Sequence, residues 1–338
     1  MKGKTKKYVS DFAVSLYSSS WVMISASELL SGKDFPQEQK EALEIVNRSH
    51  IYIITKIPKF YYIKDSISYK DELLTAIVGY KYNGKEKSIK AEDKIPSKYG
   101  ITKVKISDYP HRNIIACNSN DEEVFDFPAS LIGINSGKYQ NNQEISNLEV
   151  LYVGQSYGDG NRNTFDRLRK HETLQKILAD CSYNYPDDEV YLLSFEYMPY
   201  RIVTMMDGKA KVETTAEDDS QRFYSILENP LSEHQQICLI EAGLIKYFKP
   251  KYNKIYKEKF PSSSHKILEE CYKLDFSGLV VEINTEELNF FLYSDSVGKN
   301  FHHIIKIDLI DFTDRYGFFH FTLDKNMKTV YSPPDLIK

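Results

Sequence analysis

The stretch LEVLYVGQSYGDGNRNTFDRLRKHETLQKIL, residues 148–178, decides how this chain is interpreted. It begins with apolar and β-branched residues, which predict a strand. Gly154 then predicts a turn, and a polar loop leads into a helix expected to begin at Asn163. Arg167 and His171 stand four residues apart near the start of that helix. This order of elements places a guanidinium and an imidazole beside the end of the strand.

Two interpretations of Arg167 and His171 are open. The planar guanidinium of Arg167 can bind a phosphate, and His171 can donate a hydrogen bond or transfer a proton. The alternative is a solvated helix face, because Arg169, Lys170 and Glu172 surround them.

A second helix carries a glutamate within an apolar stripe. Ser232 with Gln235 fits a capping box, and Pro250 predicts an end near Phe248. At 3.6 residues per turn, Glu241 falls in line with the apolar side chains of Ile237, Leu244 and Phe248. A carboxylate is rarely buried without compensation, so we expect an arginine, hydrogen-bond donors or a metal ion beside Glu241. The alternative is a structural ion pair or a position at the margin of the stripe.

The composition sets limits on partners and compartment. The chain has 338 residues and a formal net charge of −4, so any nucleic-acid surface must be local. Four cysteines, none close to another in sequence, predict reduced thiols and a cytoplasmic protein. The uncharged run from residue 12 to residue 27 contains six serines and is too polar for a membrane span, so we expect no membrane association.

The rhythm of the sequence suggests three parts. Residues 1–124 are expected to form a mixed α/β region, residues 125–260 a domain of alternating strands and helices, and residues 261–338 a β-rich region. Within the first part, HIYIITKI at residues 50–57 predicts a strand, and Asn83-Gly84 predicts a hairpin. The stretch at residues 203–221 predicts an inserted hairpin or an acidic loop.

Taken together, residues 130–253 resemble the GIY-YIG nuclease family. Tyr152-Val153-Gly154 stands where that family has its second motif, Arg167 and His171 match its catalytic helix, and Glu241 matches its metal-binding glutamate. Asn253, in KPKYN, matches the asparagine that usually follows. The resemblance implies an α+β fold with a small, mostly antiparallel sheet flanked by helices, to which the β-rich N- and C-terminal regions are added.

The first motif departs from the family pattern. Gly133-Ile134-Asn135 stands where the family has Gly-Ile-Tyr on the first strand, and Asn135 has no phenol with which to act as a base. The resemblance otherwise implies Mg²⁺- or Mn²⁺-dependent hydrolysis of DNA. In that reaction Glu241 would hold the metal, Arg167 would contact the phosphate, and Tyr152, assisted by His171, would take a proton from water.

Basic residues near this centre are candidates for binding DNA. The segment from Lys246 to Lys259 has six lysines and one glutamate, and it directly follows the Glu241 helix. It could follow a phosphate backbone, or it could be a solvated linker. The candidate DNA-binding residues are Lys249, Lys251, Lys254, Arg162 and Arg169.

Three functions remain open. The first is a DNA endonuclease of the restriction, mobile-element or phage-defence type. The second, which Asn135 favours, is a catalytically impaired DNA-binding or assembly subunit that works with a protein partner or as a homo-oligomer. The third is an RNA-directed nuclease.

Overall fold

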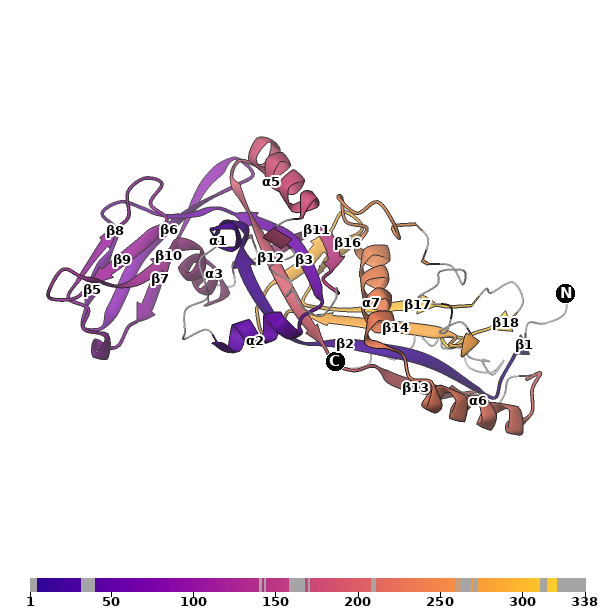
Figure 1. Cartoon of the computed structure of the whole chain (residues 1–338). Helices are drawn as coiled ribbons and strands as arrows, with labels where there is room; N and C mark the ends of the chain where they lie inside the picture. Colours follow the sequence, from indigo (N-terminus) through magenta and orange to yellow (C-terminus); the bar gives the residue numbers. More distant parts are fainter. Residues whose placement is uncertain are drawn as a thin grey trace, which may run out of the picture.

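The computed structural model describes residues 5–31, 40–139, 142, 144–157, 168–169, 171–207, 211–258, 260–261, 269, 273–310 and 315–320. Its largest feature is one mixed sheet of nine strands, in the order β16-β15-β11-β3-β12-β2-β14-β17, with β13 also paired to β2 (Figure 1). The strands are β2 (Ser10–Ser25), β3 (Ile51–Pro58), β11 (Asn147–Gln155), β12 (Asp188–Tyr197), β13 (Arg201–Met206), β14 (Gly278–Asn284), β15 (Phe291–Ser294), β16 (Val297–Asn300) and β17 (His302–Asp308).

This sheet contradicts the expected small antiparallel sheet flanked by helices. Strands hold 43% of the described residues and helices 26%, and the sheet curves until it is nearly a barrel. Its two ends approach each other, since Nε2 of His303 on β17 lies 3.1 Å from the carbonyl oxygen of Leu292 on β15. The sheet also takes strands from all three sequence regions, because β2 and β3 come from the first and β14 to β17 from the last.

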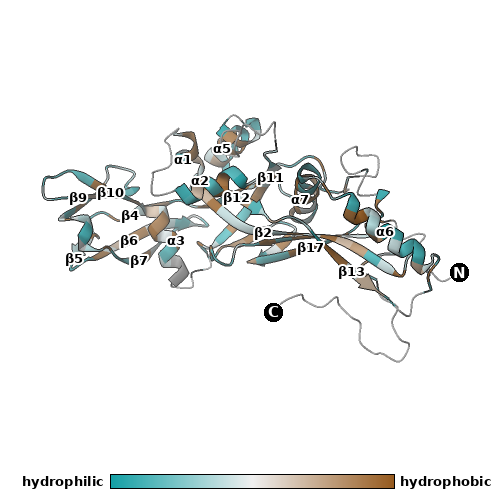
Figure 2. Cartoon of the chain, turned by 60° about the horizontal axis from the view of Figure 1, so that its bottom comes forward, coloured by the Kyte–Doolittle hydropathy of each residue, from teal (hydrophilic) through white to brown (hydrophobic). Residues whose placement is uncertain are grey.

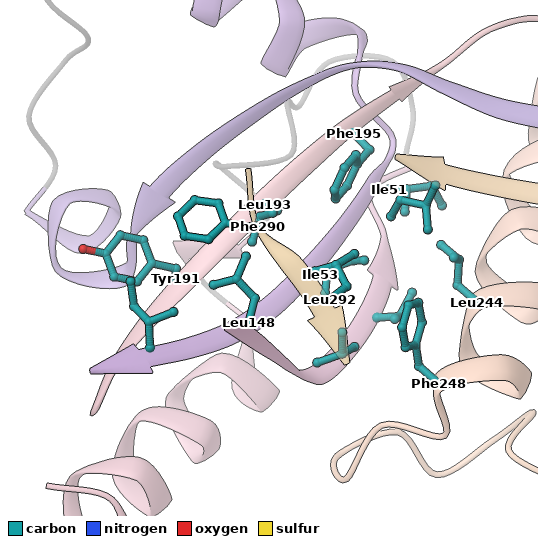
Figure 3. Packing of buried hydrophobic residues seen from close by; sticks show 14 of the residues in the cluster. Ile51, Ile53, Leu148, Tyr191, Leu193, Phe195, Leu244, Phe248, Phe290 and Leu292 are labelled. Carbon is teal, nitrogen blue, oxygen red and sulfur yellow. The ribbon is translucent and has the colours of Figure 1, made fainter. Parts of the chain in front are cut away.

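Helix α7 (Glu233–Phe248) packs against the curved sheet and touches β3, β11, β14 and β17. Strands β11 and β3 lie near one end of the strand order, and β14 and β17 lie at the other end. Because α7 touches all four, the sheet wraps around the helix. Buried side chains of α7 meet those of the strands in one continuous core (Figure 3), and Figure 2 shows brown, apolar stretches on strands of this sheet. The labelled members of this core include Ile51, Ile53, Leu193, Phe195, Leu244, Phe248 and Leu292.

The opposite face of β3, β11 and β12 packs on smaller helices. A second apolar cluster joins Ile54, Leu151 and Leu192 to Leu174 and Ile177. The helices on this side are α1 (Ala26–Leu30), α2 (Lys40–Arg48) and α5 (Glu172–Asn184). The core pair β3 and β11 therefore has helices on both faces, with α7 on one and α5 on the other.

The connection between β3 and β11 is a β-rich insertion. It holds a four-stranded and a three-stranded sheet, and it forms one end of the elongated molecule (Figure 1). The expected hairpin at Asn83-Gly84 is confirmed, since both residues have positive φ and join β6 to β7. The elements are β4 (Phe60–Tyr62), β5 (Ser68–Lys70), β6 (Leu73–Tyr82), β7 (Lys85–Lys94), η2 (Ser97–Tyr99), β8 (Lys103–Ile106), β9 (Asn113–Cys117), β10 (Glu123–Pro128) and α3 (Ala129–Tyr139).

At the other end of the molecule, β13 is followed by α6 (Ala216–Glu228), and β1 (Thr5–Lys6) pairs with β18 (Arg315–Tyr316). The expectation of a hairpin or acidic loop at residues 203–221 is wrong for the described residues, because a strand and a capped helix occupy them. Thr215 and Asp218 form the capping box that starts α6. Within the part of the chain that the structure describes, no helix has the length and apolar character needed to cross a membrane.

Asp308, at the end of β17, makes the stability of the fold depend on pH. Burial raises the pKa of its carboxyl to about 6, and among the described residues its Oδ1 atom has no hydrogen-bond partner. Because the folded-state pKa lies above the unfolded value, the contribution of this group is favourable at low pH and is lost as pH rises from about 4 through about 6. We expect Asp308→Asn to raise the free energy of unfolding by about 1 kcal/mol at pH 8, allowing for solvent screening.

Urea denaturation at two pH values measures this effect. The increase in the free energy of unfolding caused by Asp308→Asn should vanish at pH 4, because the wild-type carboxyl is already protonated in the folded protein at that pH. An equal gain at both pH values would show that the substitution acts through packing and not through charge.

Candidate active site

Two tyrosines lie side by side on the strands β3 and β11. These strands run antiparallel, with Tyr52 opposite Gly154 and Tyr152 opposite Ile54. Since side chains alternate between the faces of a strand, Tyr52 and Tyr152 lie on the same face. Their ring centroids are 6.1 Å apart.

Gly154 is glycine because the Tyr52 ring occupies the place of a side chain. A Cβ atom built at Gly154 would lie 2.5 Å from Cζ of Tyr52 and 2.7 Å from Cε1 of Tyr152. Real Cβ atoms do not approach other atoms this closely, so any side chain at this position must displace a tyrosine. Glycine at position 154 therefore allows the two rings to lie together.

His171 completes this cluster. Its Nε2 atom lies 3.4 Å from the hydroxyl oxygen of Tyr52, and its ring centroid lies 5.6 Å from that of Tyr152. His171 is the N-cap of α5 and has an extended backbone with ψ of 115°. The expectation that His171 lies inside a helix beginning at Asn163 is therefore wrong. Arg167 and Asn163 lie outside the described residues.

Glu241 lies at the end of β11, on the face that α7 covers. The predicted helix is confirmed, with its capping box at Ser232 and Gln235. Glu241 is half-buried, and its Oε2 atom accepts a hydrogen bond of 2.8 Å from Nε2 of Gln155, the last residue of β11. Gln155 and Val153 alternate with Tyr152 and Gly154 along the strand, so Glu241 and the tyrosine cluster approach the strand end from opposite faces.

The hydrogen bond from Gln155 compensates part of the cost of burying the Glu241 carboxylate. Burial and then the nearby Glu241 charge raise the pKa of the Tyr256 phenol. A raised pKa keeps that hydroxyl protonated beside the carboxylate. Glu241 is thus held in place by Gln155 at a border between core and solvent.

Asn253 ties the segment after α7 to β11. Its Oδ1 atom accepts a hydrogen bond of 2.9 Å from the backbone N–H of Val153, and its Nδ2 atom donates one of 2.8 Å to the carbonyl oxygen of the same residue. The side chain is buried. Asn253 thereby fixes the end of α7, and with it Glu241, relative to the strand that carries Tyr152.

The assignment of Gly133-Ile134-Asn135 to the first strand is wrong. These residues lie in helix α3, where Gly133 packs against Phe60. The tyrosine that lies opposite Gly154 is Tyr52, in the sequence His50-Ile51-Tyr52 at the start of β3. The sequence signal that could have identified Tyr52 is the Ile51-Tyr52 pair at the start of a predicted strand. This pair lies far upstream of Tyr152 in the chain.

The basic candidates divide into bound and exposed side chains. Arg169 donates to the carbonyl oxygen of Leu29 at 3.0 Å, and Lys251 pairs with Asp180 at 3.0 Å, so both hold parts of this chain together. Lys249 pairs with Glu258 at 3.1 Å, and Lys254 is exposed. Arg162 lies outside the described residues.

The residues present fit Mg²⁺ or Mn²⁺ better than a softer metal. The described residues contain no group of three or more His, Cys, Asp and Glu side chains placed to enclose an ion. Glu241 is one hard oxygen donor, already oriented by Gln155. Mg²⁺ is commonly held by one or two carboxylates together with water and substrate phosphate oxygens, so a single oriented carboxylate is sufficient.

Comparison with known proteins finds no relative of this chain. No family model, no curated protein and no solved structure matches this chain.

Proposed function

We propose that this protein is a metal-dependent endonuclease that hydrolyses phosphodiester bonds in DNA. The observation that carries the proposal is the meeting of Tyr52, Tyr152 and His171 on one face of the β3–β11 pair. Phenol and imidazole groups within hydrogen-bonding reach of each other are suited to moving a proton. Glu241, at the end of the same strand, supplies the hard oxygen ligand that a phosphoryl-transfer centre needs.

The division of roles follows from the contacts. Tyr152 is less buried than Tyr52 and is the better placed to accept a proton from water. Tyr52 and His171 would orient it, since the Tyr52 hydroxyl and the His171 ring contact each other. Bound at Glu241, Mg²⁺ or Mn²⁺ would neutralise charge that develops on the phosphate. Arg167 remains the predicted phosphate-binding residue.

A DNA strand crossing the end of β11 would reach both faces of the sheet. The tyrosine cluster stands on one face there and Glu241 on the other. Lys254 is an exposed cation in the segment that follows α7. Among the described residues, the cysteines at positions 117, 181 and 238 are buried and free, which supports the proposal of a cytoplasmic enzyme with reduced thiols.

The competing function is a DNA-binding or assembly subunit without catalysis. In the sequence, this function was favoured by Asn135 at the place expected for a tyrosine. In the structure, Tyr52 lies opposite Gly154, so a tyrosine is present beside Tyr152. The burial of Tyr52, which is only 1% exposed, still favours a packing role for that ring. The two functions differ in whether the hydroxyl groups of Tyr52 and Tyr152 are needed, because only catalysis requires them.

A plasmid-nicking assay with Mg²⁺ tests the phenols. We expect Tyr152→Phe to lower the nicking rate roughly 10²-fold and Tyr52→Phe to lower it less, because only the hydroxyl is lost while ring packing stays. Tyr293→Phe, on β15 of the same sheet, serves as the matched control and should leave the rate unchanged. DNA binding without nicking in the wild type would support the assembly function.

A further inference from the structure

A cavity of about 410 Å³ opens next to the proposed centre. It lies between the end of α2, the start of β3, the end of β12 and the first turns of α7. Cavities that hold small organic ligands in proteins have volumes from about 300 to 1,000 Å³. The cavity is therefore large enough for a heterocyclic ring.

The lining of this cavity has an apolar floor and a polar rim. Ile51, Phe195 and Ile240 are buried to 1% exposure or less and form part of the floor. Arg48, Glu196, His50 and Glu233 are among the polar lining residues. An apolar floor with polar groups at its rim, among them the Glu233 side chain that is 64% exposed, suits a flat ring with polar edges.

The charges of the rim disfavour an anion. The guanidinium of Arg48 is held by Glu196, with Nε–Oε1 and Nη2–Oε2 distances of 2.7 and 3.3 Å. Nε2 of His50 lies 3.3 Å from Oε1 of Glu233. The Arg48 cation is thus matched by Glu196, and Glu233 is a further carboxylate, so a phosphate would add unbalanced negative charge.

The helix end in this cavity is also capped. Ser232 and Gln235 form a reciprocal capping box, and Glu233 adds a negative charge to the first turn of α7. The amide groups that would otherwise attract a phosphate are therefore partly satisfied. A neutral ring whose amino group donates to a carboxylate fits this chemistry better.

The cavity is joined to the proposed centre by two elements. Ile51 immediately precedes Tyr52 on β3, and Ile240 immediately precedes Glu241 on α7. The carbonyl oxygen of His50 accepts a hydrogen bond of 2.8 Å from Ser156, next to the Gln155 that holds Glu241. An occupant would therefore lie close to any strand bound at the end of β11.

We propose that this cavity holds one unpaired nucleobase of the strand being cut, with an exocyclic amino group donating to Glu233. The inference rests on the proposed nuclease function, because it names the part of the substrate that lies next to the scissile phosphate. Adenine and cytosine present such an amino group, and thymine does not. Enzymes that do chemistry on a base hold it out of the stack in a pocket, which shows that proteins can bind a single unpaired base in this way.

Nucleosides test the cavity without DNA. Trp21 is the only tryptophan of the chain, and in the β2–β12 pairing it stands directly opposite Phe195 of the cavity floor. Residues paired in this way are close enough for Trp21 fluorescence to report an occupant. Titration with adenosine, cytidine and thymidine, repeated by calorimetry, should give saturable binding of the first two and roughly tenfold weaker binding of thymidine.

Glu233→Gln should weaken adenosine binding roughly tenfold, because it removes the charged acceptor. Glu228→Gln, the same change at an exposed position in α6, is the matched control and should not alter it. Inorganic phosphate should not bind the wild-type protein. Absence of adenosine binding by both methods, or equal binding of thymidine, overturns the inference.

The outcomes separate this inference from the proposed function. If the protein nicks DNA but binds no nucleoside, the proposed base pocket is wrong and the proposed nuclease function stands. A protein that binds adenosine through Glu233 but never nicks DNA keeps a nucleobase site and loses the nuclease assignment.

Discussion

Replacement of Glu241 by alanine is expected to lower Mg²⁺-dependent nicking on the order of 10³-fold. In the proposed centre this carboxylate is the protein ligand of the metal, and loss of metal stabilisation costs several kcal/mol at the transition state. Glu241 lies within an otherwise buried apolar stripe and is oriented by Gln155 at 2.8 Å. The rate of conversion of supercoiled to open-circular plasmid measures the effect.

The same assay needs a matched control and a check on folding. Glu149→Ala changes a glutamate at the other end of β11, which pairs with Lys56 at 3.2 Å, and nicking should persist in it. Circular dichroism of Glu241→Ala should match the wild type, because alanine is tolerated in a helix. Unchanged nicking by a folded Glu241→Ala protein would remove Glu241 from the chemistry.

The largest expected effect on stability is at Lys6. Its ammonium group pairs with Asp11 at 2.7 Å, and both side chains are 2% exposed. The ammonium also donates to the carbonyl oxygen of Gly317 at 3.3 Å, and Asp11 accepts from Ser277 at 3.1 Å. Lys6→Ala would leave the Asp11 charge buried without its cation, so we expect the free energy of unfolding to fall by about 3–5 kcal/mol.

Urea denaturation of three variants tests this reasoning. Lys7→Ala breaks a neighbouring pair with Asp275 in which the lysine side chain is 41% exposed, and it should cost about 0–1 kcal/mol. The double variant Lys6→Met with Asp11→Leu should cost less than Lys6→Ala, because no charge is left alone. A double variant as unstable as Lys6→Ala would show that packing, not charge, dominates at this position.

Local signals in the sequence predicted several elements correctly. The Ser232 and Gln235 capping box predicted the start of α7, and the apolar spacing predicted its buried face. Asn83-Gly84 predicted the β6–β7 hairpin, and HIYIITKI at residues 50–57 predicted β3. Each of these depends on contacts between residues close in the chain, which single-sequence patterns describe well.

The errors arose where distant segments pair. Tyr52 and Gly154 are opposite each other only because β3 and β11 pair across the whole insertion of residues 59–146. A strand expected shortly before Tyr152 therefore fell on Asn135, whose segment forms helix α3. The size of the sheet was missed for the same reason, since β14 pairs in parallel with β2 from the opposite end of the chain.

The sequence by itself determined the residue types of the candidate centre and the helix that presents Glu241, because periodicity and capping act over one or two turns. Only the tertiary structure decided that Tyr52 joins Tyr152 and His171, and that Glu241 meets the end of β11 from the other face. The physical reason is that strand pairing is a long-range contact, whose partner no local pattern specifies.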